Sequence, residues 1–417
     1  MQLTKAQRIV LIHHLPNTDA YLSTYPINNH SLPITNGDYY ITGLNNSSDS
    51  DDSVYLFPIL LEADGTPWHL ANLFLLKIAT DNRDNYKDTR DIRKKASLLL
   101  DYKIFCESSR NNNNEQAPID LFDFKHSLKS KRPTWRYYSH LMHVEKPKPG
   151  LLNAKTGAVY QFYKFAATQP NVDLDLERVE TLTSFTVFKQ TASGSLYRID
   201  GEKRSQTVKT AEPAPVSIGY VRDEGEDLRP LFQKELDALL DALQTGEFEI
   251  DEKLIVYLAL CTGERKQTIL TMRMRHLKFF EDQYLSQKKM SYKLFANSQN
   301  GCDTKYDKPH ILHVPAWLGE KIKTWAYSKK ATERREKFKQ KYGNIFNDDD
   351  MYLFLSPTGD CRYMSHLDPR YKMTLSPALG QVTRNLKYKL LRIAGNKISP
   401  DFSFHWLRAT FALLLYK

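Results

Sequence analysis

Thr262-Gly263-Glu264-Arg265 and, near the end of the chain, His405-Trp406-Leu407-Arg408 are the two segments that decide the fold of this 417-residue sequence. The first segment follows an apolar helix predicted over 253–261, and Gly263 can end that helix so that the next side chains face a ligand. His405 and Arg408 are three positions apart and therefore share one face of a helix. Each segment alone is a weak signal, and the two become informative through their order, their spacing and the residues between them.

The residues between the two segments predict a mixed α and β domain. Alternating and apolar runs favour strands, and longer runs with a helical period favour helices. A polar turn between the first two strands carries Lys305. In chain order, the predicted elements are strands at 292–295 and 311–315, one amphipathic basic helix over 317–342, a strand and turn at 352–357, and a helix over 379–394.

This succession resembles the catalytic domain of tyrosine recombinases, the phage-integrase family. Besides the two opening segments, the matching pieces are T-K at 304–305, L-F-L-S-P at 353–357 and I-S-P at 398–400. The resemblance implies a site-specific recombinase or integrase that cuts and rejoins duplex DNA through a 3′-phosphotyrosine intermediate. It also implies an intact protein that acts as a homo-tetramer on DNA.

The resemblance assigns a role to each residue of the predicted site. Arg265 and Arg408 would clamp the scissile phosphate, because planar guanidinium groups bind its developing charge with paired hydrogen bonds. His405 would donate a further hydrogen bond or take part in proton transfer. Lys305 would protonate the leaving 5′ oxygen, with Lys308 as the nearby alternative. Cations replace a metal throughout this scheme, so we expect neither a metal nor another cofactor.

The sequence departs from the family pattern at several positions. Thr268 and Trp406 stand where the family usually has acids, and Ala409 stands where a second His or Arg is common. The chain ends at Lys417, nine residues after Arg408, before the family's further helix and nucleophilic tyrosine. We therefore expect a chain that lacks the nucleophile segment, is itself inactive in cleavage, and is monomeric or weakly associated. Tyr416 is expected to be a helix-packing residue.

A basic helical region precedes this domain and resembles the family's core-binding domain in pattern only. Residues 125–164 carry nine cations against the single acid Glu145. An excess of this size predicts a phosphate-binding surface. The residues that we expect to contact DNA are Lys129, Lys131, Arg132, Arg136 and Lys155, and Trp135, Tyr137 and Tyr138 lie beside them.

Together these features predict a multidomain protein, mainly α with small β elements. We expect a helical core-binding (SAM-like) domain followed by a mixed α+β catalytic domain. The net charge of +10 and the pI near 9.1 favour a polyanionic partner. The predicted divisions are a partly β N-terminal extension at 1–65, the helical domain at 66–170, a linker with a β-hairpin at 171–222, and the catalytic domain at 223–417.

Other classes of protein fit the sequence less well. The four cysteines lack C-x-x-C spacing, which argues against a disulfide framework or a zinc site. No signal peptide or membrane-length apolar stretch occurs, so we expect a cytoplasmic, nucleoid-associated protein. His310 and His313 are expected to be ordinary polar positions, and the cations of 329–341 a solvated helix face. The alternative functions are a non-catalytic duplex-DNA-binding protein with the recombinase fold and, less favoured, an RNA-binding protein.

Overall fold

The structure is a computed structural model, and it divides the chain into two compact units, Met1–Pro213 and Ala214–Lys417. Within the described residues, no helix combines the length and the apolar composition needed to cross a bilayer. The structure describes residues 3–15, 19–23, 31–34, 39–44, 54–81, 89–109, 117–190, 194–210, 215–223, 226–288 and 290–416. Side chains are described at 3–15 and, within these ranges, from residue 54 onward except at 189 and 226.

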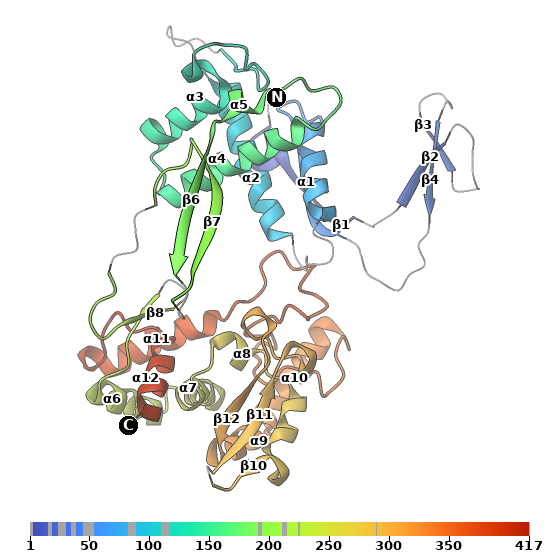
Figure 1. Ribbon diagram of the computed structural model, residues 1–417. Helices are drawn as coiled ribbons and strands as arrows, with labels where there is room; N and C mark the ends of the chain where they lie inside the picture. The colour runs from blue at the N-terminus through green and yellow to red at the C-terminus, as the bar shows by residue number, and fades with distance from the viewer. Residues whose placement is uncertain are drawn as a thin grey trace. The chain divides into compact units, whose positions relative to one another are not determined.

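The first unit is built on four longer helices and one short helix (Figure 1). Proline occupies the first position of both α3 and α4, where its missing N–H is not needed and its fixed φ suits a helix. A π-helical turn, Leu141–Glu145, follows α3 directly. The helices are α1 (His69–Asp81), α2 (Arg90–Ser108), α3 (Pro133–His140), α4 (Pro149–Ala166) and α5 (Leu176–Val179).

Aromatic side chains from α2, α3 and α4 fill the core of this unit. Tyr102, Tyr137 and Tyr163 are almost completely buried. The hydroxyls of Tyr102 and Tyr163 are 2.7 Å apart, and Tyr163 also donates to the carbonyl of Leu121 at 2.5 Å. Burial raises the pKa of both tyrosines well above the ordinary value, so both remain neutral hydrogen-bonding groups. This network ties α2 to α4 and to the loop at Leu121.

The strands of the first unit form three small antiparallel sheets. Phe57 and Leu60 of β5 lie in the same core as the helices, so this strand packs with the helical part of the unit. The hairpin predicted within 171–222 is present as β6 and β7. The polar runs at 45–53 and 111–114 lie outside the described residues. The pairs are β1 (Ile9–Leu15) with β5 (Val54–Leu60), β2 (Asp19–Ser23) and β3 (Ser31–Ile34) on either side of β4 (Tyr39–Leu44), and β6 (Leu182–Gln190) with β7 (Leu196–Arg204).

The second unit is mainly helical with two small antiparallel sheets, in the order β8-β9 and β10-β11-β12. The helices predicted over 253–261 and 379–394 and the two strands at 292–295 and 311–315 are confirmed. Its elements are β8 (Val221–Asp223), β9 (Glu226–Leu228), α6 (Gln233–Gln244), α7 (Ile250–Thr262), α8 (Lys266–Leu270), β10 (Leu285–Ser286), β11 (Ser291–Ala296), β12 (His310–Pro315), α9 (Ala316–Ala326), α10 (Lys329–Tyr342), α11 (Gln381–Ala394) and α12 (Trp406–Tyr416).

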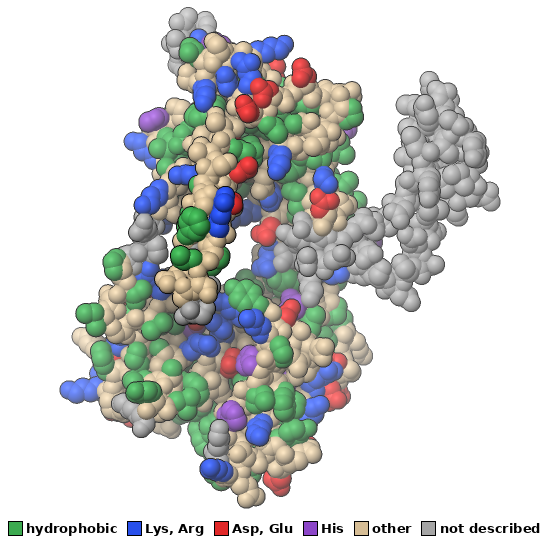
Figure 2. Space-filling model, viewed as in Figure 1, with side chains coloured by type: hydrophobic (Ala, Val, Ile, Leu, Met, Phe, Trp, Pro, Cys, Tyr) green, Lys and Arg blue, Asp and Glu red, His purple; other side chains and the backbone are tan. Residues whose placement is uncertain are grey.

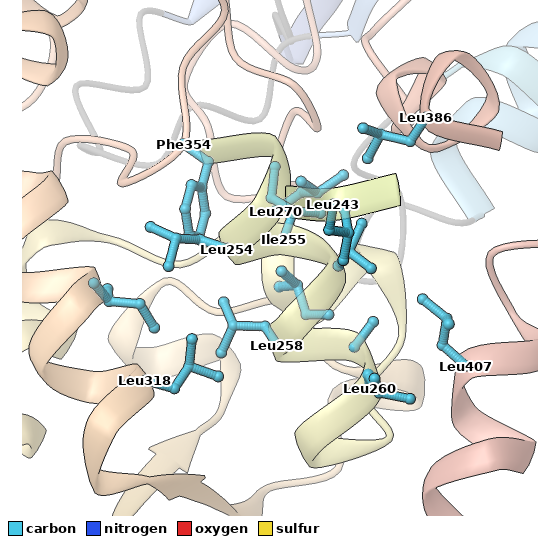
Figure 3. Packing of buried hydrophobic residues seen from close by; sticks show 14 of the residues in the cluster. Leu243, Leu254, Ile255, Leu258, Leu260, Leu270, Leu318, Phe354, Leu386 and Leu407 are labelled. Carbon is cyan, nitrogen blue, oxygen red and sulfur yellow. The ribbon is translucent and has the colours of Figure 1, made fainter. Parts of the chain in front are cut away.

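Helix α7 is the centre of this unit. Its residues Leu254, Ile255 and Leu258 are buried, and a helix that is apolar on nearly all sides belongs inside a core. Helices α9 and α12 and strand β12 all pack against it. In Figure 3 the labelled side chains around α7 from other segments are Leu243, Leu270, Leu318, Phe354, Leu386 and Leu407.

The prediction of one helix over 317–342 was wrong, because the chain breaks between α9 and α10. Ser328 begins the second helix, and its hydroxyl accepts a hydrogen bond from the backbone N–H of Ala331 at 3.3 Å. A serine in this position satisfies a donor that the first turn of a helix leaves free. The run of cations on α10 also contains a buried member. Arg334 is 5% exposed and donates to Asp251 of α7 at 2.8 Å.

Of the strand and turn predicted at 352–357, the strand was wrong, but the chain does turn there, and the N–H of Gly359 donates to the carbonyl oxygen of Ser356 at 3.0 Å. Tyr352 and Leu355 each form only an isolated bridge, to Arg273 and Cys361. Met351–Leu355 is buried throughout, because Leu353 and Phe354 belong to the main core of the unit and the other three residues to a smaller cluster. A continuous apolar run is typical of a buried strand, but here it fills the space between two clusters without a ladder partner.

Gly263 ends α7 in a conformation that few other residues adopt. Its φ is +67°, in the left-handed region, and its N–H donates to the carbonyl of Ala259 at 3.0 Å. A Cβ added at this position would lie 2.3 Å from Cδ1 of Phe411 on α12. The backbone conformation and the close approach of α12 both require glycine here.

Replacing Gly263 by alanine is expected to destabilise the second unit by about 1–3 kcal/mol, because it combines a left-handed backbone with a steric overlap. Chemical denaturation of the full chain would measure this loss. Gly246→Ala is the matched control, since its φ is not positive and no heavy atom lies within 4 Å of an added Cβ. Equal stabilities for the two variants would contradict the requirement for glycine at 263.

Candidate functional site

The end of α7 and the start of α12 form the frame of the candidate site. After Gly263 the chain turns, and Arg265 becomes the residue that precedes α8. From α12, Arg408 donates through Nη1 to the carbonyl oxygen of Gly263 at 2.9 Å. The close approach that excludes a side chain at 263 thus also brings Arg408 to the turn that carries Arg265.

Three predicted site residues converge on one carboxylate, that of Asp223 at the end of β8. Oδ2 of Asp223 lies 3.2 Å from Nη2 of Arg265, 3.4 Å from Nε2 of His405 and 3.9 Å from Nε of Arg408. The four side chains are between 16% and 38% exposed. The structure therefore brings Arg265, His405 and Arg408 together around a single anionic oxygen. We call these three residues the cationic cluster.

A pocket of about 410 Å³ adjoins the cationic cluster. Arg265 and His405 line it, and further cations come from α8 and α11: Lys266, Arg384 and Lys387. Figure 2 shows a group of Lys and Arg side chains on one face of the second unit, with His side chains nearby. An opening lined by cations can accept a negatively charged ligand larger than one carboxylate.

Lys305 lies on the turn between β11 and β12. It is partly buried, its Nζ is 5.3 Å from the ring centre of Tyr306, and the alternative Lys308 is exposed. Two contacts tie the start of this turn to the α8 segment that follows Arg265. The Sγ of Cys302 donates to the carbonyl of Thr268 at 3.2 Å, and the N–H of Asp303 donates to Oγ1 of Thr271 at 2.8 Å.

His366 bridges the two ends of the turn that carries Lys305. Its Nδ1 is 2.9 Å from Oδ2 of Asp303, which is 1% exposed, and its Nε2 is 3.5 Å from Oδ1 of Asp307. Tyr306 and Asp307 have φ values of +58° and +54°, which are costly for residues other than glycine. The imidazole therefore lies between the two ends of a strained turn.

A second histidine pairs with the acid beside Arg265. Nε2 of His310, the first residue of β12, lies 3.0 Å from Oε1 of Glu264. Its Nδ1 is 3.2 Å from the carbonyl oxygen of Lys308. His310 thus links the lysine turn to the segment that carries Arg265.

Among the described residues, no group of three or more His, Cys, Asp or Glu side chains could hold a metal ion.

The five basic residues predicted to contact DNA have different environments in the first unit. Arg132 is 7% exposed and donates to the carbonyls of His126, Ser127 and Arg178. Lys155 is 8% exposed and its Nζ lies 2.6 Å from Glu145 and 3.6 Å from Asp101. These two side chains hold protein groups together, and their burial argues against direct DNA contact.

The other three predicted residues are accessible. Lys129 and Lys131 are exposed, and Arg136 is partly exposed. Nζ of Lys129 is 3.1 Å from Oγ1 of Thr181 and 5.5 Å from the ring centre of Trp135. Arg136 lines a shallow pocket of about 440 Å³ together with Ser108, Ser109, Ser130 and Ser139. A guanidinium surrounded by hydroxyls suits a phosphate oxygen.

Asp223 was not among the residues that the sequence pointed to. It lies far upstream of Arg265 in the sequence, on a three-residue strand with no motif around it. Only the folded hairpin of β8 and β9 places it against α12. The burial of Arg132 and Lys155 was equally hidden, because their partners are backbone carbonyls or acids that pair across the fold.

Replacing His366 by alanine is expected to release the turn at 303–308, because the variant loses the group that joins Asp303 to Asp307. Hydrogen exchange of amides in this segment should become about 10-fold faster or more, while α7 and α12 keep their protection. The exposed His313 of β12 provides the control variant His313→Ala. Unchanged exchange at 303–308 in His366→Ala would show that the turn holds itself.

No protein-family model matches the chain. No curated protein matches it in sequence either. Among solved structures, the chain is similar to XerH site-specific recombinase bound to its difH substrate in a pre-cleavage complex, with 14% identity, a TM-score of 0.40, and 82% of this chain and 73% of that chain covered. It is also similar to the Tn1549 transposon integrase in complex with circular intermediate DNA, with 12% identity, a TM-score of 0.36, and 83% and 86% covered.

A third similar structure is XerA recombinase, with 13% identity, a TM-score of 0.23, and 84% of each chain covered. Two of the three are recombinases by name and one is an integrase, and the likeness extends over most of each chain. At these TM-scores and identities it carries no argument about activity or about single residues. The proposals that follow rest on the geometry of the cationic cluster.

Proposed function

We propose that this chain is a duplex-DNA-binding protein of the site-specific recombinase type, and that the cationic cluster binds a backbone phosphate. The observation that carries the proposal is the convergence of Arg265, His405 and Arg408 on one anionic oxygen. Two guanidinium groups and an imidazole place nitrogen donors 3.2 to 3.9 Å from one oxygen position, and such donors bind phosphate oxygens. The neighbouring cationic pocket gives room for the rest of the nucleotide backbone.

The chemistry proposed for this site is transfer of the DNA phosphate to a tyrosine oxygen. Arg265 and Arg408 would stabilise the negative charge that grows on the non-bridging oxygens, and His405 would add a third donor. Lys305 would give its proton to the leaving 5′ oxygen, so the turn held by His366 would set its position. The donor set is cationic throughout, and the proposal assigns no metal.

The nucleophile is the part of this reaction to which we assign no residue. Tyr416 lies on α12, eight residues beyond Arg408, and is 91% exposed, so the expectation that it packs within the fold was wrong. This spacing places it roughly 12 Å along the helix axis from Arg408. Because Tyr416 does not lie at the phosphate site, the second candidate function is duplex-DNA binding without strand cleavage.

The first unit would supply the sequence-independent grip on DNA. We propose Lys129, Lys131 and Arg136 as its phosphate contacts, because they are accessible and lie in the most basic region of the sequence. If the chain is a recombinase, we further propose that it acts as a homo-tetramer on two DNA sites and is associated with the nucleoid in the cytoplasm. A filter assay with duplex DNA and structured RNA as competitors separates the DNA proposal from an RNA-binding one.

Arg265→Ala and Arg408→Ala are expected to weaken binding of a short duplex by about 5- to 30-fold each, since each removes a charge-assisted contact worth about 1–2 kcal/mol. Fluorescence anisotropy at one fixed salt concentration measures the loss. In any preparation that cleaves DNA, both variants should lose strand cleavage while keeping the fold.

Arg392→Ala is the control for these variants, because this arginine is in the same unit, is 67% exposed, and pairs only with Glu247 among the described residues. Circular dichroism melting checks that all three proteins are folded. If either cluster variant binds or cleaves like the unmodified chain, the phosphate-clamp assignment is wrong.

In the first unit, Lys129→Ala, Lys131→Ala and Arg136→Ala are expected to lower duplex affinity without changing the melting temperature. Arg132→Ala should instead lower the free energy of unfolding by about 2–3 kcal/mol, because it leaves three carbonyl acceptors without their donor. Thermal denaturation and anisotropy on the same preparations separate the two classes. Unchanged duplex affinity in all three accessible variants would remove this surface from the proposal.

A further inference from the structure

Asp223 occupies the position that the proposed function gives to a phosphate oxygen. Its Oδ2 is the atom on which Arg265, His405 and Arg408 converge, and its Oδ1 lies 3.5 Å from Nη2 of Arg265. A carboxylate and a phosphate carry the same sign of charge and accept from the same donors. Only one of them can be bound by these three side chains at a time.

The hairpin that carries Asp223 is anchored at its other strand. Leu228 of β9 is 4% exposed and belongs to the main core of the unit. The indole N–H of Trp406 on α12 donates to the carbonyl oxygen of Asp227 at 3.3 Å. Arg222 and Asp227 face each other across the hairpin and pair at 2.7 and 2.9 Å. These contacts hold β9 in place beside the cationic cluster.

The Asp223 end has a weaker attachment to the rest of the unit. The two strands have three residues each, and a two-stranded ribbon is marginal by itself in water. The neighbouring Val221 is 67% exposed. Within the described part of the chain, the side chain of Asp223 pairs with the three residues of the cationic cluster, and a more highly charged ligand can replace these contacts.

We propose that Asp223 is a built-in competitor of the DNA phosphate, which binds the cationic cluster in the free protein and is displaced when DNA binds. This inference rests on the proposed function, since it takes the cluster to be a phosphate clamp. In the free protein the carboxylate partly neutralises the clamp and keeps the two guanidinium groups oriented. Binding of a phosphate then requires that the contacts of Asp223 with the cluster be broken.

The competition gives the site a preference for one class of ligand. A single inorganic phosphate makes only the contacts of the cluster, so most of its binding energy is spent on displacing Asp223. A duplex also contacts cations outside the cluster, and these contacts offset the displacement. Asp223 therefore favours an extended polyanion over free phosphate or a mononucleotide.

The opposite role for Asp223 is that of a positioning acid, which orients Arg265 and Arg408 for the ligand and stays in place when the ligand binds. The two roles predict opposite effects of removing the charge. Loss of a competitor strengthens ligand binding, whereas loss of a positioning acid weakens it. The sign of one change in affinity therefore decides between them.

The test uses Asp223→Asn in the full chain, which removes the charge at nearly constant side-chain volume. We expect the variant to bind a short duplex about 3- to 10-fold more tightly at fixed salt, the range that a partly exposed ion-pair arrangement provides. Inorganic phosphate, followed by isothermal titration, should gain at least as much. Asp223→Glu keeps the competing charge and should stay close to the unmodified chain.

Asp227→Asn is the matched control, because it removes the same charge from the same hairpin at a residue that pairs with Arg222. We expect it to change duplex affinity less than twofold. In the double variant Asp223→Asn with Arg265→Ala, the gain from Asp223→Asn should disappear. Melting curves of each protein exclude a general loss of structure.

The outcomes separate this inference from the function beneath it. Equal or weaker duplex binding by Asp223→Asn overturns the competitor role, even if Arg265→Ala and Arg408→Ala still weaken binding. If those two variants bind duplex normally in the presence of Asp223, the proposed phosphate clamp itself fails. If Asp223→Asn binds duplex more tightly and this gain disappears when Arg265 is also replaced, both the competitor role and the phosphate clamp are supported.

Discussion

The close approach of α12 to Gly263 is the constraint on which the candidate site depends. Phe411 of α12 lies against the glycine, and one turn earlier Arg408 binds the carbonyl oxygen of the same residue. Because Arg265 follows two positions later, the contact that joins the two helices also sets the distance between the two guanidinium groups. Packing and charge geometry are therefore not independent here. A shift of α12 that relieved the contact at Gly263 would also separate the two arginines.

Buried ion pairs hold the two ends of this arrangement. At the start of α7, Asp251 is completely buried and accepts from Arg334 at 2.8 Å and from Arg362 at 2.5 Å. At the start of α12, the guanidinium of Arg229 lies 4.2 Å from the ring centre of Trp406 and binds Glu235. Such pairs add little net stability but are costly to break. They therefore favour one register of the helices over others.

The sequence predicted α7, α11, the paired strands β11 and β12, and the association of Arg265, His405 and Arg408, because these depend on local periodicity and on the order of motifs. It did not predict the break at Ser328, where a single capping residue outweighed a continuous helical pattern. It could not predict the position of Asp223, which is set by tertiary packing of a short hairpin. The sequence identifies the charged residues and the helix or strand on which each lies. Which charges face solvent also depends on partners that are distant in the sequence, as the contacts of Arg132 with Arg178 and of Lys155 with Asp101 illustrate.

The burial of Arg132 and Lys155 also changes what the basic composition of the first unit means for its thermodynamics. A cation that is already neutralised by Glu145 and Asp101, as Lys155 is, holds no site at which a phosphate can replace a counterion. The number of ions released when a protein binds DNA follows the number of phosphates it neutralises, and not the number of lysines and arginines in its sequence. Nine cations between 125 and 164 therefore overstate the entropic gain from ion release. Some cations of this region, such as Arg132 and Lys155, stabilise the fold through internal contacts.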